Sequence, residues 1–322
     1  MKHFVNKTLT YSISLLSLLL CLFNTLIAQE WSVYQNYSSN SFYNINPAAA
    51  GFDGAFISQL SASKQWLGIT GSPAAQVFSN SVRLGDEDFF DPSLLINRPF
   101  FNVAPRVGLG LTIFNESSGP LRHTGMMFAY AYHIKMRNNR LSFGLSGIVT
   151  QYHLNVNEFN PVSSNDPSLY TNASSIIPDV NLGAMFYNSK LFIGASANGL
   201  INVNNIIDHT KSFPDIVVCS GYKYSVNSIY KLEPSIFIFR YGQGSISADL
   251  NGKLFYRDKN WLLLSYHTNG EVSAGFGVTI KTGIQLNYIY GVNTTGLATY
   301  NQGSQSIALR ADIVALVRKR NK

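Results

Sequence analysis

Histidine, cysteine and acidic side chains are the groups of this chain that could hold a metal ion or move a proton. No two of the histidines have the spacing that would place two ligands on one helix face, and no cysteine stands beside them; they are His3, His123, His133, His153, His209 and His267. The acidic cluster at 86–91 lacks the spaced loop and bidentate glutamate of a dedicated Ca²⁺ site, so a solvated loop explains it better. We therefore expect no catalytic set, no metal and no cofactor, and a protein that is not an enzyme.

Two further patterns involve glycines and isolated charges. Gly108 and Gly110 lack the third glycine and the following helix of a dinucleotide-binding loop, and they are expected to relieve crowding inside the barrel or to allow strand coiling. Four charged residues alternate with apolar ones and are expected to face the lumen of a barrel: Asp249, Lys253, Glu271 and Lys281. They would either line a water channel or form internal ion pairs that hold a plug.

The elements that must carry these residues follow a period of two. In 271–281 the apolar residues are Val272, Ala274, Phe276, Val278 and Ile280, and the alternate positions are mostly small and polar. The segments 107–114 and 246–254 repeat the pattern. A soluble sandwich would carry bulky charges on its polar face, so the pattern is typical of an antiparallel transmembrane β-barrel, an all-β fold.

Composition supports the same interpretation. Charged residues make up 13% of the chain, about half the usual share for a soluble domain, and aromatic residues another 13%. Outside the N-terminus, no apolar run is long enough for a transmembrane helix. A helical membrane bundle is therefore excluded, and the modest positive net charge gives no reason to expect nucleic acid as a partner.

The N-terminus reads as a secretory signal peptide. Lys2 and Lys7 precede an apolar stretch at 13–23, and small and polar residues lead to an expected cleavage after Ala28. Export would leave Cys219 as the only cysteine, which excludes an intramolecular disulfide. We expect a signal peptide at 1–28, a periplasmic or plug segment at 29–54, a barrel at 55–317 and a basic periplasmic tail at 318–322.

The pattern predicts an up-and-down barrel of about fourteen strands in the outer membrane of a Gram-negative cell. The expected strands are 55–66, 74–84, 105–115, 124–136, 139–152, 179–188, 190–199, 216–226, 230–240, 245–256, 260–267, 271–282, 284–293 and 304–316. An even number places both termini in the periplasm, where the connections should be short. The connection at 85–104 is an exception, and its aromatic pairs could form a partner surface or pack under the barrel: Phe89, Phe90, Phe100 and Phe101.

Several short motifs, in order along the chain, carry a resemblance to a known family. They are 46–51 (NPAAAG), 64–73 (KQWLGITGSP), 106–110, 115–120, 129–132, 178–183 and 233–235. Together they resemble the PorP/SprF family of type IX secretion membrane proteins of Bacteroidota. One departure is at 303–306, where the family tends to have Gly-Ser-His-Glu and this chain has Gly-Ser-Gln-Ser.

The resemblance implies an outer-membrane barrel that works with periplasmic components of the type IX system. Members support secretion or surface anchoring of large adhesin-like partners, as in gliding motility. By this resemblance, the candidate partner-binding residues are Asn46, Pro47, Gly51, Trp66, Gly71 and Pro73. Their other interpretation is that they fix the first hairpin of the barrel. The alternative function is a passive porin or transporter for small solutes.

Overall fold

The computed structural model describes residues 41–54, 56–84, 106–155, 173–201, 213–242 and 244–313. The expected signal peptide, the aromatic pairs of 85–104 and the basic tail lie outside these ranges. In the part of the chain that is described, no helix is both long enough and apolar enough to cross a membrane.

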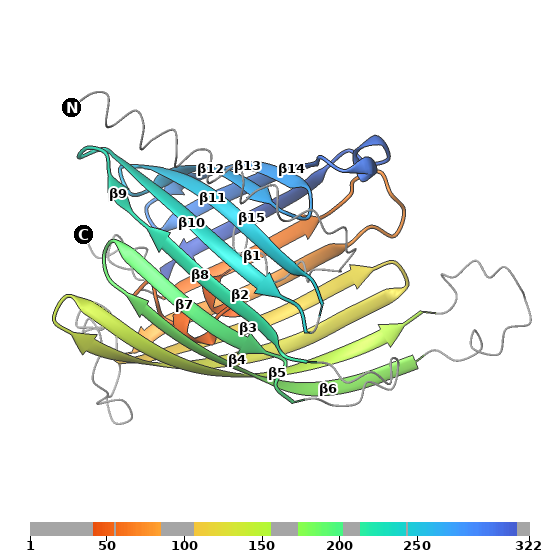
Figure 1. The fold of residues 1–322 in the computed structure, drawn as a ribbon, viewed down its shortest axis with the longest axis horizontal. Coiled ribbons are helices and arrows are strands. Elements are labelled where there is room, and N and C mark those ends of the chain that lie inside the picture. Colours follow the sequence, from red (N-terminus) through yellow and green to blue (C-terminus); the bar gives the residue numbers. More distant parts are fainter. Residues whose placement is uncertain are drawn as a thin grey trace, which may run out of the picture. The chain divides into compact units, whose positions relative to one another are not determined.

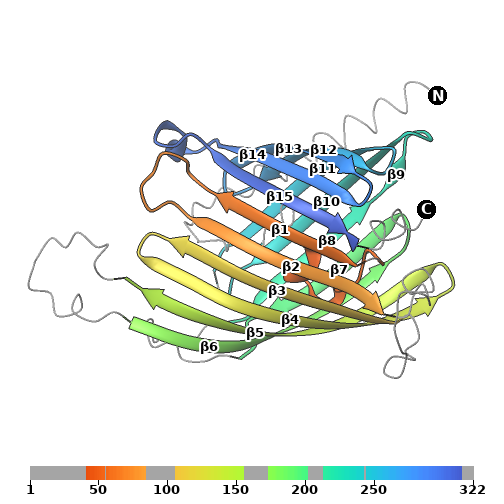
Figure 2. The ribbon, with the colours of Figure 1, turned by 180° about the vertical axis from the view of Figure 1, so that it is seen from behind.

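The described chain forms one antiparallel sheet that closes on itself, as predicted (Figures 1 and 2). Its strands are β1 (Ile57–Lys64), β2 (Ala74–Leu84), β3 (Val107–Ser118), β4 (Leu121–Met136), β5 (Asn139–Leu154), β6 (Ala173–Tyr187), β7 (Leu191–Asn198), β8 (Asp215–Tyr222), β9 (Tyr224–Ser225), β10 (Tyr230–Arg240), β11 (Ile246–Tyr256), β12 (Asn260–His267), β13 (Glu271–Lys281), β14 (Ile284–Asn293) and β15 (Ser304–Asp312). β1 pairs with β15 and β10 pairs with β11, which completes the ring. Because the two residues of β9 continue β8 beyond Lys223, the barrel has fourteen strands.

The barrel has two distinct ends. At the terminal end, β1 begins at Ile57 and β15 ends at Asp312, and these two residues are paired. The predicted tight connections all lie at this end, at 137–138, 188–190, 226–229, 257–259 and 282–283. The opposite end is called the far end below.

Several strand boundaries differ from the sequence-based expectation, and the differences at the β3–β4 turn and at the start of β6 are the most informative. β3 and β4 extend through polar residues to a two-residue turn at 119–120, where Gly119 has a φ of +55°. β6 begins at Ala173 rather than near 179, although it contains Pro178. Pro178 is tolerated because this part of β6 pairs with β5 only, while β7 pairs with β6 from Leu182 onward. A proline without an N–H fits such an unpaired strand edge.

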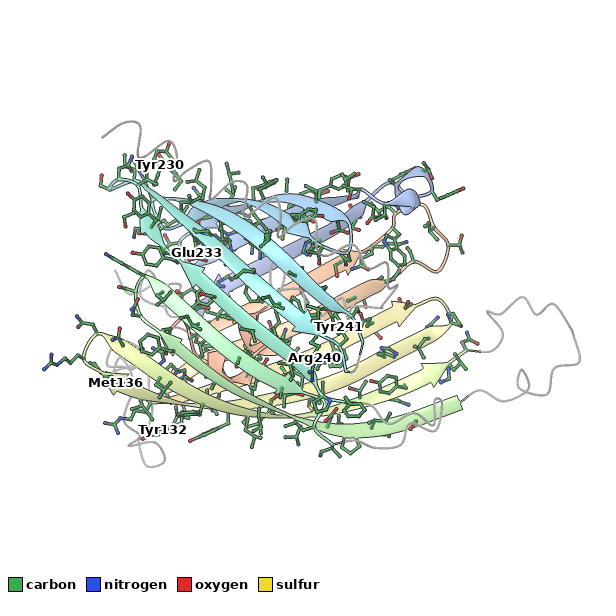
Figure 3. The ribbon with its side chains drawn as sticks, viewed as in Figure 1. Tyr132, Met136, Tyr230, Glu233, Arg240 and Tyr241 are labelled. Carbon is green, nitrogen blue, oxygen red and sulfur yellow. The ribbon has the colours of Figure 1, made fainter. Side chains whose placement is uncertain are left out.

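Residues alternate between the two faces of the wall. On β13, the side chains of Phe276, Val278 and Ile280 are exposed on the outside, while Ser273 and Gly277 are buried inside. The side chains along β10, from Tyr230 to Arg240, alternate in the same way (Figure 3). The outer face is therefore apolar, as a lipid-facing surface requires.

A short segment of the chain occupies part of the lumen. Two 3₁₀ turns, η2 (Phe42–Asn44) and η3 (Pro47–Ala49), lie inside the ring of strands, and we call residues 41–54 the plug. The plug packs with wall residues of β2 to β8 and β10 into one buried apolar cluster. A second, smaller cluster lies on the other side of the lumen and consists of Trp261, Leu263 and Ile289, with Phe255 packed against it.

Candidate functional site

The plug is built around Asn46. Its Oδ1 accepts a hydrogen bond from the backbone N–H of Ala48 at 3.0 Å, so the side chain caps η3, and Pro47 follows at the first helical position. Its Nδ2 donates to the carbonyl oxygens of Ala184 and Ala195, at 3.2 and 3.3 Å. One amide thus shapes the turn and also joins it to β6 and β7.

Polar side chains of the wall bind two carbonyl groups of the plug. The hydroxyl groups of Ser142 and Ser196 donate to the carbonyl oxygens of Ala48 and Ile45, at 2.6 and 2.8 Å. Asn198 also donates to Ile45, at 3.2 Å. The buried plug backbone has only the few hydrogen bonds of its turns, so these bonds to the wall replace the water that other carbonyl groups of the plug would need.

Tyr43 anchors the start of the plug on β3. Its hydroxyl donates to the carbonyl oxygen of Leu111 at 2.8 Å, while the Thr112 hydroxyl donates to Oδ1 of Asn44 at 2.7 Å. Burial raises the pKa of Tyr43, so its phenol stays protonated and remains a donor. The ring lies directly over Gly110, where an added Cβ would come within 2.7 Å of it.

Glycines of the wall provide the space in which the plug sits. A Cβ on Gly108 would overlap the backbone of Ala50, one on Gly144 would overlap Pro47 and Ala48, and one on Gly183 would overlap the Asn46 side chain. At Gly194 it would come within 2.8 Å of the Asn46 amide. These positions therefore allow the plug backbone to approach the strands more closely than any side chain would permit.

A buried chain of donors and acceptors holds the end of the plug. Arg83 donates to the carbonyl oxygen of Phe52 at 2.8 Å and to the hydroxyl of Tyr187 at 2.9 Å. The Tyr187 hydroxyl can then donate to Nδ1 of His133, 2.9 Å away, which leaves Nε2–H of His133 to donate to the carbonyl oxygen of Ala50 at 2.8 Å. This directionality requires a neutral histidine with its proton on Nε2.

Aromatic rings of the plug also pack against aromatic rings of the wall. The Phe42 ring lies edge-on to the rings of Phe192 and Phe237, with centroid distances of 5.4 and 5.7 Å, and Phe52 packs edge-on to Tyr187 at 4.8 Å. Edge-to-face pairs of this kind contribute roughly 0.5–1.5 kcal/mol beyond the burial of their area. Both ends of the plug are thus fixed by aromatic rings.

The four charged residues expected in the lumen have separate surroundings. Asp249 accepts from Nδ1 of the buried His267 at 2.7 Å, and Glu271 accepts from the hydroxyl groups of Ser273 and Ser304. Lys253 lies over the ring of Trp261, and Lys281 is exposed at the terminal end. Among the described residues, no ion pair joins two of these four, and no three His, Cys, Asp or Glu side chains could hold a metal ion together.

The candidate partner-binding residues separate into two groups. Asn46, Pro47 and Gly51 belong to the buried plug, and Gly51 has a φ of +71° beside Val82 and Arg83 near the terminal end. Trp66, Gly71 and Pro73 lie at the far end. There Pro73 accepts a backbone bond from Gln65, and Gly71 accepts one from Gly119. The structure does not bring the two groups together, and their binding to a partner stays a prediction.

Local sequence patterns do not identify most of the residues that hold the plug. No motif contains Ser142, Ser196, Arg83 or Tyr187, Thr112 is one small residue of an alternating strand, and His133 is one of six histidines without metal-ligand spacing. A sequence signal exists only for the glycines, which recur at lumen-facing positions of β3, β5, β6 and β7. The role suggested for Gly108 and Gly110, relief of crowding, agrees with the space that they leave for the plug.

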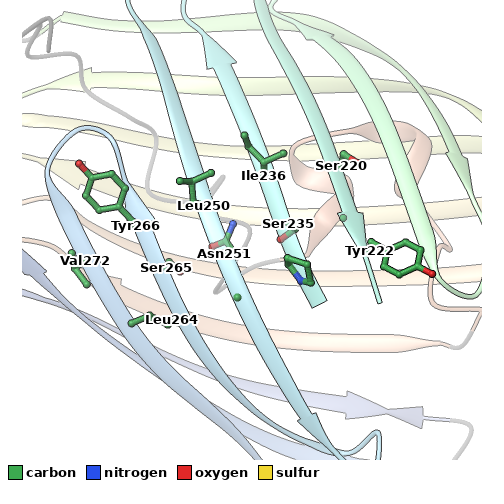
Figure 4. A pocket seen from close by; sticks show the side chains of 13 residues that line it. Ser220, Tyr222, Ser235, Ile236, Leu250, Asn251, Leu264, Ser265, Tyr266 and Val272 are labelled. Atoms are coloured by element: carbon green, nitrogen blue, oxygen red, sulfur yellow. The ribbon is translucent and has the colours of Figure 1, made fainter. Parts of the chain in front are cut away.

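A recess of about 540 Å³ lies in the wall, apart from the plug. Figure 4 shows the side chains that line it, with Tyr222, Ile236, Leu250, Leu264 and Tyr266 among them. The ladder between β10 and its neighbour is interrupted here, because β9 pairs with Lys231 and Leu232 and β8 pairs only from Ser235 onward. Pro234, which has no N–H, lies in this gap.

The chain is also similar, at low sequence identity, to several solved structures. The chain is similar to the Ralstonia pickettii toluene transporter TbuX, with 12% identity, a TM-score of 0.49 and coverage of 83% of this chain and 92% of that one. The monoaromatic hydrocarbon channel CymD has 10% identity and a TM-score of 0.48, with coverage of 85% of this chain and 94% of that one. The Acinetobacter baumannii outer membrane protein Omp33 has 7% identity and a TM-score of 0.46, with coverage of 80% of this chain and 96% of that one. No curated protein sequence matches the chain.

A family model covers nearly the whole barrel. The model of the type IX secretion system membrane protein PorP/SprF matches residues 26–311, a range that contains the plug and almost every described strand. The fold and the family both fit a protein of the outer membrane. The chain belongs to the PorP/SprF family of type IX secretion system membrane proteins.

Proposed function

We propose that this protein is a non-enzymatic scaffold of the type IX secretion system, which supports secretion or surface anchoring of a large adhesin-like protein and docks periplasmic components of the machinery. The observation that carries this proposal is the plug, because the motif at 46–51 lies inside the lumen and is bonded to β4 through β7. A passive porin needs a water-filled lumen. A barrel whose lumen holds its own chain is better suited to present its two ends to partners.

In this proposal, the terminal end faces the periplasm and the far end faces the cell exterior. Tyr300 lies in the far-end connection at 294–303 and is 79% exposed, while Asp258 lies in an exposed turn of the terminal end. A cysteine at Tyr300 should react with a membrane-impermeant thiol reagent on whole cells, and one at Asp258 should react only after lysis. Labelling of Asp258→Cys but not Tyr300→Cys on intact cells would reverse the orientation.

The test of function is deletion of the gene. Loss of one or a few large proteins from the cell surface, with unchanged uptake of small solutes, is the result expected for a scaffold. If the surface proteins stay in place and uptake of a small solute falls, the protein is a porin or transporter instead. Complementation with the wild-type gene must restore the surface proteins.

A further inference from the structure

A cavity of about 810 Å³ lies at the terminal end, on the side of the lumen that the plug leaves unfilled. Its lining includes plug residues Phe42 and Phe52, the turns at 257–259 and 282–283, and the final residues of β15. A volume of this size is within the range of roughly 300–1,000 Å³ that is usual for ligand sites. The cavity therefore has room for a small group of side chains from another molecule.

Lysine and aromatic side chains are combined on one wall of this cavity. The Lys253 ammonium lies 4.4 Å from the ring centroid of Trp261 and 5.7 Å from that of Phe255, and Lys223 lies 4.4 Å from the Phe255 centroid. A ring face attracts an ammonium group but does not neutralise its charge or accept three hydrogen bonds. Lys253 is thus held in position while it keeps donors for another group.

Four carboxylates line the cavity, and those other than Asp312 form ion pairs with cations other than Lys253. Glu233 binds Lys223 at 3.2 Å and Asp53 binds Arg310 at 2.9 Å, while Asp258 in the adjoining turn binds Lys231 at 2.5 Å. In the described ranges, no carboxylate oxygen lies within 4 Å of the ammonium groups of Lys253, Lys259 or Lys281, all of which line the cavity. The cavity therefore has unpaired positive charge beside aromatic surface.

We propose that this cavity binds a carboxylate-bearing peptide segment of a protein partner, with the carboxylate on Lys253 and an adjacent apolar side chain against Phe255 and Trp261. A charge-assisted hydrogen bond in a partly dehydrated site is stronger than one between neutral groups. The inference rests on the proposed scaffold function, because it assigns to the terminal end a place where machinery docks.

The test uses the purified mature protein in detergent and a fluorescein-labelled heptapeptide that contains three glutamates and one phenylalanine. Fluorescence anisotropy should report binding of this peptide, and a twin with glutamine in place of glutamate should bind about tenfold more weakly or worse. Lys253→Gln should cause a loss of similar size, and Lys253→Arg should retain binding. Lys190→Gln is the matched control, because it removes an exposed lysine from the same end of the barrel.

A second measurement uses the wild-type protein, so its result does not depend on whether a variant folds. Carbodiimide should couple the peptide to the wild-type protein, and mass spectrometry should locate the link at Lys253. Absence of binding by the glutamate peptide, equal binding of the glutamine twin, or equal losses for Lys190→Gln and Lys253→Gln would overturn the proposal. Displacement of the peptide by an equimolar amount of free glutarate would assign the site to a small dicarboxylate instead of a protein partner.

The two proposals can fail separately. If the peptide does not bind and the deletion strain still loses its large surface proteins, the scaffold function stands and the binding site is wrong. If the peptide binds through Lys253 and the deletion strain keeps its surface proteins, the cavity is a binding site of a protein with another function.

Discussion

The two sides of the lumen differ in what lies against the barrel wall: the plug on one side and a cavity on the other. On the side of β3 to β7, the plug backbone is bonded to wall side chains and aromatic rings close over it. On the side of β11 to β15 there is a cavity, and four buried atoms have no hydrogen-bond partner among the described residues: Oδ1 of Asn251, Oγ of Ser265, Oδ1 of Asn287 and Oγ of Ser306. On the plug side, Nδ2 of Asn44 and Oδ1 of Asn198 are also buried without such a partner. The plug fills most of the first side, whereas the second side has space for water or a ligand.

Glycine illustrates the difference. Gly108, Gly144 and Gly183 make room for the plug backbone. On the opposite side, a Cβ on Gly277 would meet the Trp261 ring, and one on Gly291 would meet the Glu271 carboxylate. There the space is used by side chains of neighbouring strands. The position of a glycine in a strand therefore does not reveal what it accommodates until the barrel is closed.

The largest effect is expected when a side chain fills the space that the plug occupies. In Gly144→Leu, the new side chain would overlap the backbone of Pro47 and Ala48, which cannot move aside as a flexible side chain could. The plug should leave the lumen and lose its bonds to the wall, each of which contributes roughly 0.5–1.5 kcal/mol. A cysteine placed at Ala48 should then react quickly with a maleimide, whereas in the otherwise wild-type chain it should not react.

Gly147→Leu is the matched control on the same strand. An added Cβ at Gly147 meets no atom within 4 Å. The Ala48→Cys thiol should therefore stay protected in this variant. Protection in the Gly144→Leu variant as well, in a barrel shown to be folded by its heat-modifiable migration on a gel, would contradict the close packing of plug and wall.

The second largest effect is expected from a charge on the lipid-facing surface of the barrel wall. Phe276→Arg places a charge on the lipid-facing surface and should cost about 2–4 kcal/mol if the site is near the bilayer midplane. Thr279→Arg, on the other face of β13, should cost much less. Folding into lipid vesicles, followed by urea titration, measures both, and equal losses of stability would show that the register of β13 is wrong.

A smaller difference in stability should distinguish the plug side of the lumen from the cavity side. Asn46→Ala removes the cap of η3 and two bonds to the wall, so the free energy of unfolding should fall by about 1–3 kcal/mol. Asn251→Ala removes a buried acceptor that has no partner among the described residues, and its effect should stay within about 1 kcal/mol. Denaturant titration in detergent tests both, and a larger loss for Asn251→Ala would mean that its side of the lumen is also tightly bonded.

The barrel could be predicted from the sequence because a period of two is a local property. The alternation in 271–281 and the turn at 282–283 require no knowledge of distant strands. The boundaries that differed, at 119–120 and at Ala173, depend on whether a neighbouring strand is present. Local polarity does not contain that information.

The plug site could be predicted only in part. The motif at 46–51 was noticed through the family resemblance, but its burial depends on residues such as Gly144 and Gly183, which come from separate strands. The donor chain from Arg83 through Tyr187 to His133 joins three strands that are distant in the sequence. Such sites form only when the ring of strands closes around the plug, so no local pattern encodes them.

The most direct test of the scaffold account is the ion conductance of the purified mature protein in a planar lipid bilayer. The account predicts that the wild-type protein is almost silent, that Gly144→Leu produces clear conductance steps as the plug leaves, and that Gly147→Leu behaves like the wild type. Stable, porin-like conductance of the wild-type protein that Gly144→Leu leaves unchanged would contradict the scaffold account, because a water-filled lumen is what a passive porin needs.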